Sequence, residues 1–316
     1  MAEVSKNETA GDGGPLEAAG GAQGAALTAL VIGALTLGLS PIFVRLSELG
    51  PTATAFHRVF LALPLLWLWQ AVDARRSLAV PKKKLSRRDY AIMALGGFFF
   101  AGDLAFWHWS LQFTAVANAT LLATMAPIWV TLGAFFLFGE RFSRTYLIGL
   151  IVAIIGAGVL MGGSFRLGLD NVLGDFLGLV TGIFFGAYML TIGRLRAHFS
   201  TASIMFLTTV VTAVILLPVT LVSGESLIAT TYYGWAVLLA LALLTHVGGQ
   251  GAVAYALAHL PTPFSSVGML LEALGAAFLA WVILGEALDR WQILGAVVVI
   301  IGILLARRGS RRNKPA

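Results

Sequence analysis

Residues 126–156 read APIWVTLGAFFLFGERFSRTYLIGLIVAIIG, and residues 272–302 read EALGAAFLAWVILGEALDRWQILGAVVVIIG. In both stretches an apolar segment ends in Gly-Glu, a short polar connection follows, and a second apolar segment carries two glycines seven residues apart. The second stretch repeats the first at an offset of 146 residues, which superposes Phe138-Gly139-Glu140 on Leu284-Gly285-Glu286. This collinear match predicts that the chain contains two copies of one structural unit.

The composition predicts helices that cross a membrane. Of the 316 residues, 58% are hydrophobic and only 11% are charged, whereas about a quarter of the residues in a soluble domain are charged. Apolar runs of about 20 residues are long enough to span the hydrocarbon core. Ten such runs lie at 27–48, 52–72, 89–111, 114–138, 144–163, 173–193, 201–222, 233–257, 263–284 and 291–306. The sequence therefore predicts an all-α membrane protein with ten transmembrane helices.

The number of helices and the basic residues predict the topology. Each unit has five helices, so the second copy enters from the opposite face and the two units are inverted. The side that holds both termini carries 17 Lys and Arg residues and the other side carries 3, which by the positive-inside rule places both termini in the cytoplasm. We expect the protein to lie in the cell inner membrane and to consist of four parts. These are a disordered cytoplasmic tail at 1–26, the first repeat at 27–163, the inverted second repeat at 173–306, and a basic cytoplasmic tail at 307–316.

Inverted repeats favour transport over other membrane functions. Two similar bundles in opposite orientations have two nearly equivalent packings, one open to each side of the membrane, and this is the basis of alternating access. Glycines allow helices to approach closely in lipid. They occur in three series, at 174, 178, 182 and 186, at 149 and 156, and at 295 and 302. The inverted repeats therefore predict a secondary transporter. The glycine series predict that the fifth, sixth and tenth helices pack closely against their neighbours.

The doubled pattern resembles that of EamA-type members of the drug/metabolite transporter superfamily. The resemblance covers residues 27–306 and is carried by Ala126-Pro127, Phe138-Gly139-Glu140 and its echo Leu284-Gly285-Glu286. With its aromatic third helix and basic second loop, the chain is most similar to YddG-type aromatic amino acid exporters. The resemblance implies a central cavity surrounded by the first four helices of each unit, with the fifth and tenth helices peripheral. The second copy departs from the first at one place, where it has Glu272-Ala273 instead of Ala126-Pro127. The proline is therefore not repeated, and a kink at Pro127 need not have a counterpart in the second copy.

Ionisable side chains within the predicted helices indicate where a cavity lies, because they are costly in lipid and are tolerated mainly beside a cavity or a partner. At a rise of about 1.5 Å per residue, both Glu272 and His246 fall near the middle of the bilayer. Helical spacing assembles polar, aromatic and methionine neighbours around them. The predicted substrate-binding residues are Glu272, His246, Gln250, Asn118, Trp107, Tyr188, Met269 and Asp103. Such a lining suits a small molecule with an apolar body and a zwitterionic head, such as an aromatic or other apolar amino acid.

Several of these polar residues have a structural alternative. Arg58 lies close enough to the end of its helix to extend to the membrane surface. Trp107 could belong to the interfacial aromatic belt. Asp103 could form a structural salt bridge with Arg58. Glu140 lies close to the positive start of the next helix, where a carboxylate is stabilised, and is expected to be a structural fastener.

Other functions are less favoured by the sequence. A carrier of phosphorylated metabolites or nucleotide sugars is the alternative, but phosphate recognition calls for basic groups in the cavity, and no Lys lies inside a predicted helix. The chain has no cysteine and no HExxH, GxxxxGK[ST] or GxSxG motif, so we predict no catalytic residue, metal, cofactor or ATP. Nucleic acid is not expected either. The predicted partners are a small-molecule substrate, the lipid bilayer and, through Glu272, His246 and Asp103, protons.

Overall fold

The structure is a computed structural model that describes residues 15–76, 86–114, 116–162, 171–196, 198–284 and 289–311. Every regular element within these ranges is a helix, and ten stretches are long and apolar enough to cross a membrane. The prediction of an all-α protein with ten transmembrane helices is therefore confirmed.

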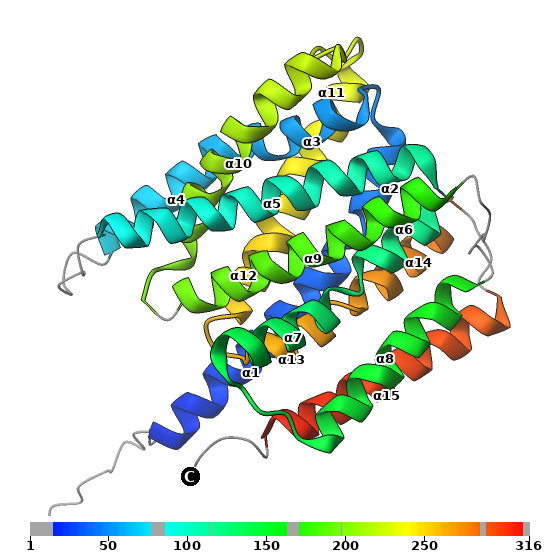
Figure 1. Cartoon of the computed structure of the whole chain (residues 1–316). Coiled ribbons are helices and arrows are strands. Elements are labelled where there is room, and N and C mark those ends of the chain that lie inside the picture. Colours follow the sequence, from blue (N-terminus) through cyan, green and yellow to red (C-terminus); the bar gives the residue numbers. More distant parts are fainter. Residues whose placement is uncertain are drawn as a thin grey trace, which may run out of the picture.

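The spans are of two kinds (Figure 1). Five are single helices: α5 (Arg87–Phe113), α8 (Arg144–Gly162), α9 (Val172–Leu195), α10 (Thr201–Ser223) and α15 (Arg290–Arg311). The other five are composite: α1 (Pro15–Leu37) with α2 (Ser40–Leu46); α3 (Pro51–Phe60) with α4 (Leu63–Arg76); α6 (Val116–Ala123) with α7 (Ala126–Phe138); α11 (Tyr232–Ala240), η2 (Leu241–Gln250) and α12 (Gly251–Ala256); and α13 (Thr262–Gly268) with α14 (Leu271–Leu284). The segment η2 is a π-helix, a form that is rare and often found at functional sites.

The outermost helices extend into the segments that we expected to be tails. Helix α1 begins at Pro15, so residues 15–26 are helical rather than disordered. Pro15 suits the first position of a helix, and the Ala-rich sequence after it has a high helix propensity. Helix α15 likewise continues to Arg311, where Arg307, Arg308 and Arg311 place positive charge at the helix C-terminus, which the helix dipole favours. Residues 1–14 and 312–316 lie outside the described ranges.

The fourth and ninth spans are interrupted at corresponding places. Helix α6 gives way to α7 at Thr124–Met125, just before Pro127, whereas α13 gives way to α14 at 269–270 without a proline. The break therefore recurs even though the proline does not. In the ninth span, Gly268 precedes the break, and the Leu270 and Ala273 N–H groups bond to carbonyls three residues earlier instead of four. This tighter turn interrupts the α-helix where proline does so in the first unit.

Helix pairing is consistent with an internal two-fold relation between the units. The third span (α5) packs on the sixth (α9), and correspondingly the eighth (η2 and α12) packs on the first (α1). The fourth span (α6 and α7) packs on the sixth, and the ninth (α14) packs on the first. The second span packs on the seventh, and the fifth packs along the tenth. When a two-fold rotation exchanges the two units, each of these span pairs becomes another of the pairs or remains the same pair.

Glycines form the closest helix contacts, as predicted. A Cβ added to Gly302 would lie 2.3 Å from the Ala153 nitrogen, and one added to Gly149 would lie 2.3 Å from the Ala306 nitrogen. Helices α8 and α15 therefore meet backbone to backbone. In Figure 1 this pair lies to one side of the other spans. On α9, a Cβ on Gly186 would lie 3.0 Å from the Trp129 Cβ, which makes the predicted glycine ridge the surface that packs on the fourth span.

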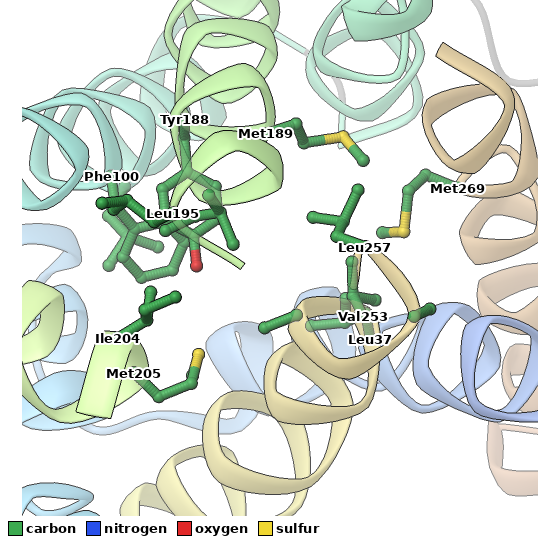
Figure 2. Close-up of a cluster of buried hydrophobic side chains, with 14 of the residues drawn as sticks. Leu37, Phe100, Tyr188, Met189, Leu195, Ile204, Met205, Val253, Leu257 and Met269 are labelled. Carbon is green, nitrogen blue, oxygen red and sulfur yellow. The ribbon is translucent and has the colours of Figure 1, made fainter. Parts of the chain in front are cut away.

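Apolar side chains fill the interior between the remaining spans. Figure 2 shows Phe100 and Tyr188 side by side, with Met189, Leu257 and Met269 grouped nearby. All five are buried and belong to one cluster. The helices on either side of the centre are thus held together by a continuous apolar core, next to which the polar residues of the site are placed.

Candidate functional site

A cavity lies between the spans at the depth where the fourth and ninth are interrupted. Its walls come from α1, α2, α3, α5, α6, α7, α9, η2 and the α13–α14 span. The lining residues are Leu37, Ser40, Arg58, Phe100, Asp103, Leu104, Trp107, Thr120, Ala123, Thr124, Ala126, Pro127, Thr181, Phe185, Gln250, Met269 and Glu272. Neither α8 nor α15 contributes to this lining, which agrees with their expected peripheral place.

Arg58 is the one basic residue among the described residues that line the cavity. It lies in α3 and is only 5% exposed, so it is held inside the protein and does not extend to the membrane surface. One guanidinium nitrogen (Nη1) donates a 2.8 Å hydrogen bond to the Ser40 hydroxyl. The Nε atom is buried and has no hydrogen-bond partner. Since a guanidinium carries five N–H donors, Arg58 retains donors for an occupant of the cavity.

Two carboxyl groups share the cavity with Arg58. Asp103 comes from the middle of α5, and Glu272 from the first turn of α14, next to the break in the ninth span. Both interact electrostatically with Arg58. The guanidinium's hydrogen bond within the described residues goes to Ser40, so Asp103 does not hold Arg58 in the hydrogen-bonded salt bridge considered above. The three groups thus place one positive and two acidic side chains in a single chamber.

Five of the eight residues proposed from the sequence line this cavity: Glu272, Asp103, Gln250, Trp107 and Met269. The Trp107 ring is buried, so it belongs to the cavity wall and not to an exposed aromatic belt. The side-chain nitrogen of Gln250, Nε2, is buried without a partner. Like Arg58 Nε, this nitrogen can donate a hydrogen bond to a bound ligand or water.

The other three proposed residues lie away from the cavity lining. His246 contacts Thr209 of α10 through a 2.9 Å hydrogen bond, and its ring packs against Phe100. The Tyr188 ring packs against that of Phe100 in a tilted arrangement, with ring centroids 4.8 Å apart. Asn118 donates a 3.0 Å hydrogen bond to Asp175 at the start of α9. His246 and Tyr188 support the wall from behind, whereas Asn118 ties the fourth span to the sixth.

Sequence reasoning missed several residues of the wall. Ser40, Thr120 and Thr181 line the cavity, and as small polar residues they do not stand out within apolar spans. Thr120 Oγ1 is buried and unpaired, which makes it, with Arg58 and Gln250, one of three cavity residues with an unsatisfied polar atom. Buried polar atoms in proteins are otherwise almost always paired. This concentration of unsatisfied groups is the signal that the sequence could not provide.

The cavity is small in the described conformation. About 60 Å³ is open to the centres of water-sized molecules, which is room for a few waters. Pockets that bind small molecules usually measure about 300–1,000 Å³. A metabolite therefore requires the walls to separate.

At the end of the bundle opposite to the termini, Glu48 and Glu225 connect the two units through hydrogen bonds. Glu48, between α2 and α3, accepts hydrogen bonds from the backbone nitrogens of Thr230 and Thr231, just before α11. The side-chain hydrogen bond from Thr231 contributes most to holding the pKa of Glu48 below its ordinary value of 4.5. In return, Glu225 of the α10–α11 connection accepts a 2.8 Å bond from the Ala53 nitrogen in the first turn of α3. Each loop thus satisfies a helix start in the opposite unit.

A different set of contacts lies at the end that bears the termini. Arg194 at the end of α9 lies 3.5 Å from the centre of the Phe138 ring. Partial burial raises the pKa of Glu140, and the nearby Arg194 opposes that shift. Ser143, immediately before α8, accepts a hydrogen bond from the Tyr146 nitrogen in the first turn of that helix. Glu140 therefore lies among helix ends, as expected for a fastener, while Glu286 lies outside the described residues.

The described residues offer no cluster of three or more His, Cys, Asp or Glu side chains that could hold a metal ion. The lining side chains can form hydrogen bonds, ion pairs and apolar contacts with an occupant. These are the means by which a protein recognises a small amphipathic molecule.

Comparisons with known proteins agree with this architecture. The model of the EamA-like transporter family matches residues 24–162 and again 172–308. A protein of Archaeoglobus fulgidus named as an uncharacterized transporter is 26% identical over 269 residues, covering 84% of this chain and 91% of that protein. The pseudopaline exporter CntI of Pseudomonas aeruginosa is 24% identical over 227 residues, covering 72% of this chain and 78% of that protein. A solved crystal structure shares the fold, with a TM-score of 0.75 at 17% identity, over 92% of this chain and 99% of that one.

Proposed function

Because the chain belongs to the EamA-like transporter family and is a multi-pass protein of the inner membrane, we propose that it exports small zwitterionic metabolites, chiefly aromatic and other apolar amino acids. The single observation that carries this proposal is the cavity that combines Arg58 with Asp103 and Glu272. Export is supported by the relative that is named as an exporter. The proposal makes this chain functionally similar to YddG-type exporters.

The charged groups suit the head of an amino acid. A carboxylate can accept two parallel hydrogen bonds from a guanidinium, and Arg58 has an unpartnered Nε beside the donor that it gives to Ser40. An ammonium group can donate to Asp103 or Glu272, which line the same cavity. One cation and two acids therefore complement a substrate that carries both charges.

The rest of the lining suits an apolar side chain. Trp107, Phe100 and Phe185 supply aromatic faces, and Met269 supplies a flexible thioether. Aromatic rings stack well on such faces, and methionine adapts to ligands of different shape. This combination favours aromatic substrates and admits aliphatic ones.

Phosphorylated compounds fit the cavity less well. A phosphate group needs several basic donors, and the lining offers one arginine beside two acidic side chains. The acids would repel a doubly charged anion unless both were protonated. We therefore do not favour a carrier of sugar phosphates or nucleotide sugars, and we expect neither catalysis nor ATP use.

Alternating access of the two inverted units is the proposed mechanism, with both termini in the cytoplasm. The interrupted fourth and ninth spans meet at the cavity, and discontinuous helices of this kind commonly form transport sites. The cavity must widen to admit a metabolite, which rocking of the units against each other would provide. Protons are the proposed coupling ion, since Asp103 and Glu272 can each take up a proton when the substrate ammonium leaves.

The direct test is counterflow in proteoliposomes with labelled tryptophan, phenylalanine and threonine. We expect accumulation of tryptophan and phenylalanine in vesicles preloaded with the unlabelled amino acid, and weaker accumulation of threonine. Absence of exchange for all three would reject amino acids as substrates. A separate experiment imposes a pH gradient: flux that is indifferent to the gradient would remove proton coupling and leave the substrate assignment intact.

A further inference from the structure

A second cavity lies at the end of the bundle that bears the termini. Figure 1 shows that α1 begins and α15 ends at this end of the molecule. The groove between them is lined by Gln23, Leu27, His259, Leu260, Pro261, Phe264, Arg307 and Ser310. About 240 Å³ of it is open to the centres of water-sized molecules, four times the corresponding volume of the central cavity. The two cavities share no lining residue.

The groove lies at the level where the spans end. Gln23 is the third residue of the span that begins at Gly21, Pro261 immediately precedes the span that begins at Thr262, and Arg307 is three residues from the end of the last span at Ser310. Such positions lie at the height of the lipid headgroups. Because α15 packs with α8 outside the transport cavity, an occupant would approach from the membrane and not along the transport path.

The lining has two chemically different parts. Among the described residues that line the groove, Arg307 is the one with a full positive charge and none is acidic; His259, Gln23 and Ser310 are further polar groups. Leu27, Leu260, Pro261 and Phe264 are apolar. Along α1, Leu27 lies one turn deeper in the membrane than Gln23.

We infer that this groove binds one anionic phospholipid, whose phosphate pairs with Arg307 and whose acyl chain runs along Leu27 and Phe264. Basic pockets between transmembrane helices recognise anionic headgroups in this way. A free phosphate would use only the polar part and would leave the apolar half of the groove unfilled. The inference concerns a site distinct from the substrate cavity and does not depend on which substrate is transported.

The test uses the full-length protein in dodecyl maltoside with added phosphatidylglycerol or phosphatidylcholine of identical acyl chains, followed by native mass spectrometry. We expect one tightly retained phosphatidylglycerol and no retained phosphatidylcholine. In Arg307→Gln the apparent affinity for phosphatidylglycerol should fall about tenfold, as expected for loss of one charge-assisted interaction. Leu27→Trp should also reduce retention, because the larger side chain fills the apolar part.

The adjacent Arg308 provides a matched control, because it is exposed and does not line the groove. Arg308→Gln removes the same charge from the same helix and should leave retention unchanged. Equal loss in both arginine variants would overturn the inference in favour of nonspecific charge attraction. Displacement of the lipid by inorganic phosphate alone would assign the groove to a soluble anion. A variant that lacks residues 1–14 tests whether that acidic segment occupies the groove. Lipid retention in this variant but not in the full-length protein would assign the groove to residues 1–14.

Discussion

Replacing Arg58 with glutamine should abolish the preference of the transporter for substrates that carry a carboxylate. The paired substrates are tryptophan and tryptamine, which share the indole ring and the amine and differ in the carboxylate. If Arg58 binds that carboxylate, the wild-type protein should transport tryptophan with a much lower KM than tryptamine. In Arg58→Gln the two KM values should converge, chiefly because that of tryptophan rises.

The expected magnitude follows from the donors of the guanidinium. Arg58 gives one hydrogen bond to Ser40 and has an unpartnered Nε. A hydrogen bond to a charged group contributes about 1.5–3 kcal/mol net, which corresponds to about a 10- to 150-fold change in affinity. Glutamine removes the charge and keeps a polar amide at the position of Nε. We expect the KM for tryptophan to rise within that range.

The assay is initial-rate uptake into proteoliposomes, with each variant first shown to be monodisperse in detergent. His57 is a matched control, because it is adjacent in α3, is equally buried at 5% exposure, and bonds the Ala53 carbonyl instead of lining the cavity. His57→Gln should leave the ratio of the two KM values unchanged. An unaltered ratio in a folded Arg58→Gln protein would refute the assignment of Arg58 to the substrate carboxylate.

Three further predictions test the site and the fold. Glu272→Gln and Gln250→Ala should each lower flux at least about fivefold, since both residues line the cavity; normal flux in both would mean that the substrate binds elsewhere. Gly302→Leu should destabilise the protein through overpacking, which typically costs about 1–3 kcal/mol, and this should appear as a lower temperature of aggregation in detergent. Gly158→Leu, where an added Cβ meets nothing within 4 Å, should be tolerated, and equal loss in both variants would contradict the close contact of α8 with α15. Glu48→Gln should lower Tm at pH 7, and the difference should disappear as the pH falls through the Glu48 pKa below 4.5, because the native contacts stabilise the ionised carboxylate; a difference that persists at pH 3 would contradict this.

The span count and the internal repeat could be predicted from the sequence because both are patterns along the chain. Membrane helices need about 20 apolar residues, and that requirement is visible without tertiary structure. The glycine series of α8, α9 and α15 also predicted the close contacts of these helices, since close approach in lipid depends on small residues. The break in the ninth span was not predictable in the same way. Without a proline it depends on local bonding around Gly268 and Leu270.

The site was only partly predictable, because helical spacing tells which residues share a face but not which neighbour that face meets. Asp103 and Glu272 were proposed as ionisable side chains within predicted helices, and both line the cavity. His246 met the same criteria, yet it faces Thr209 of α10; it lies in the π-helical segment, whose wider turn a 3.6-residue period does not describe. Arg58 was assigned little weight because it lies near a helix end, whereas tertiary packing encloses it.

Alternating access around the central cavity is tested most directly by labelling a single cysteine there. The chain has no cysteine of its own, so Thr124→Cys, in the wall at the break of the fourth span, introduces one thiol. A membrane-impermeant maleimide should modify it both in right-side-out and in inside-out vesicles, and saturating substrate should slow both reactions. Modification from one side alone, or from neither, would contradict the account.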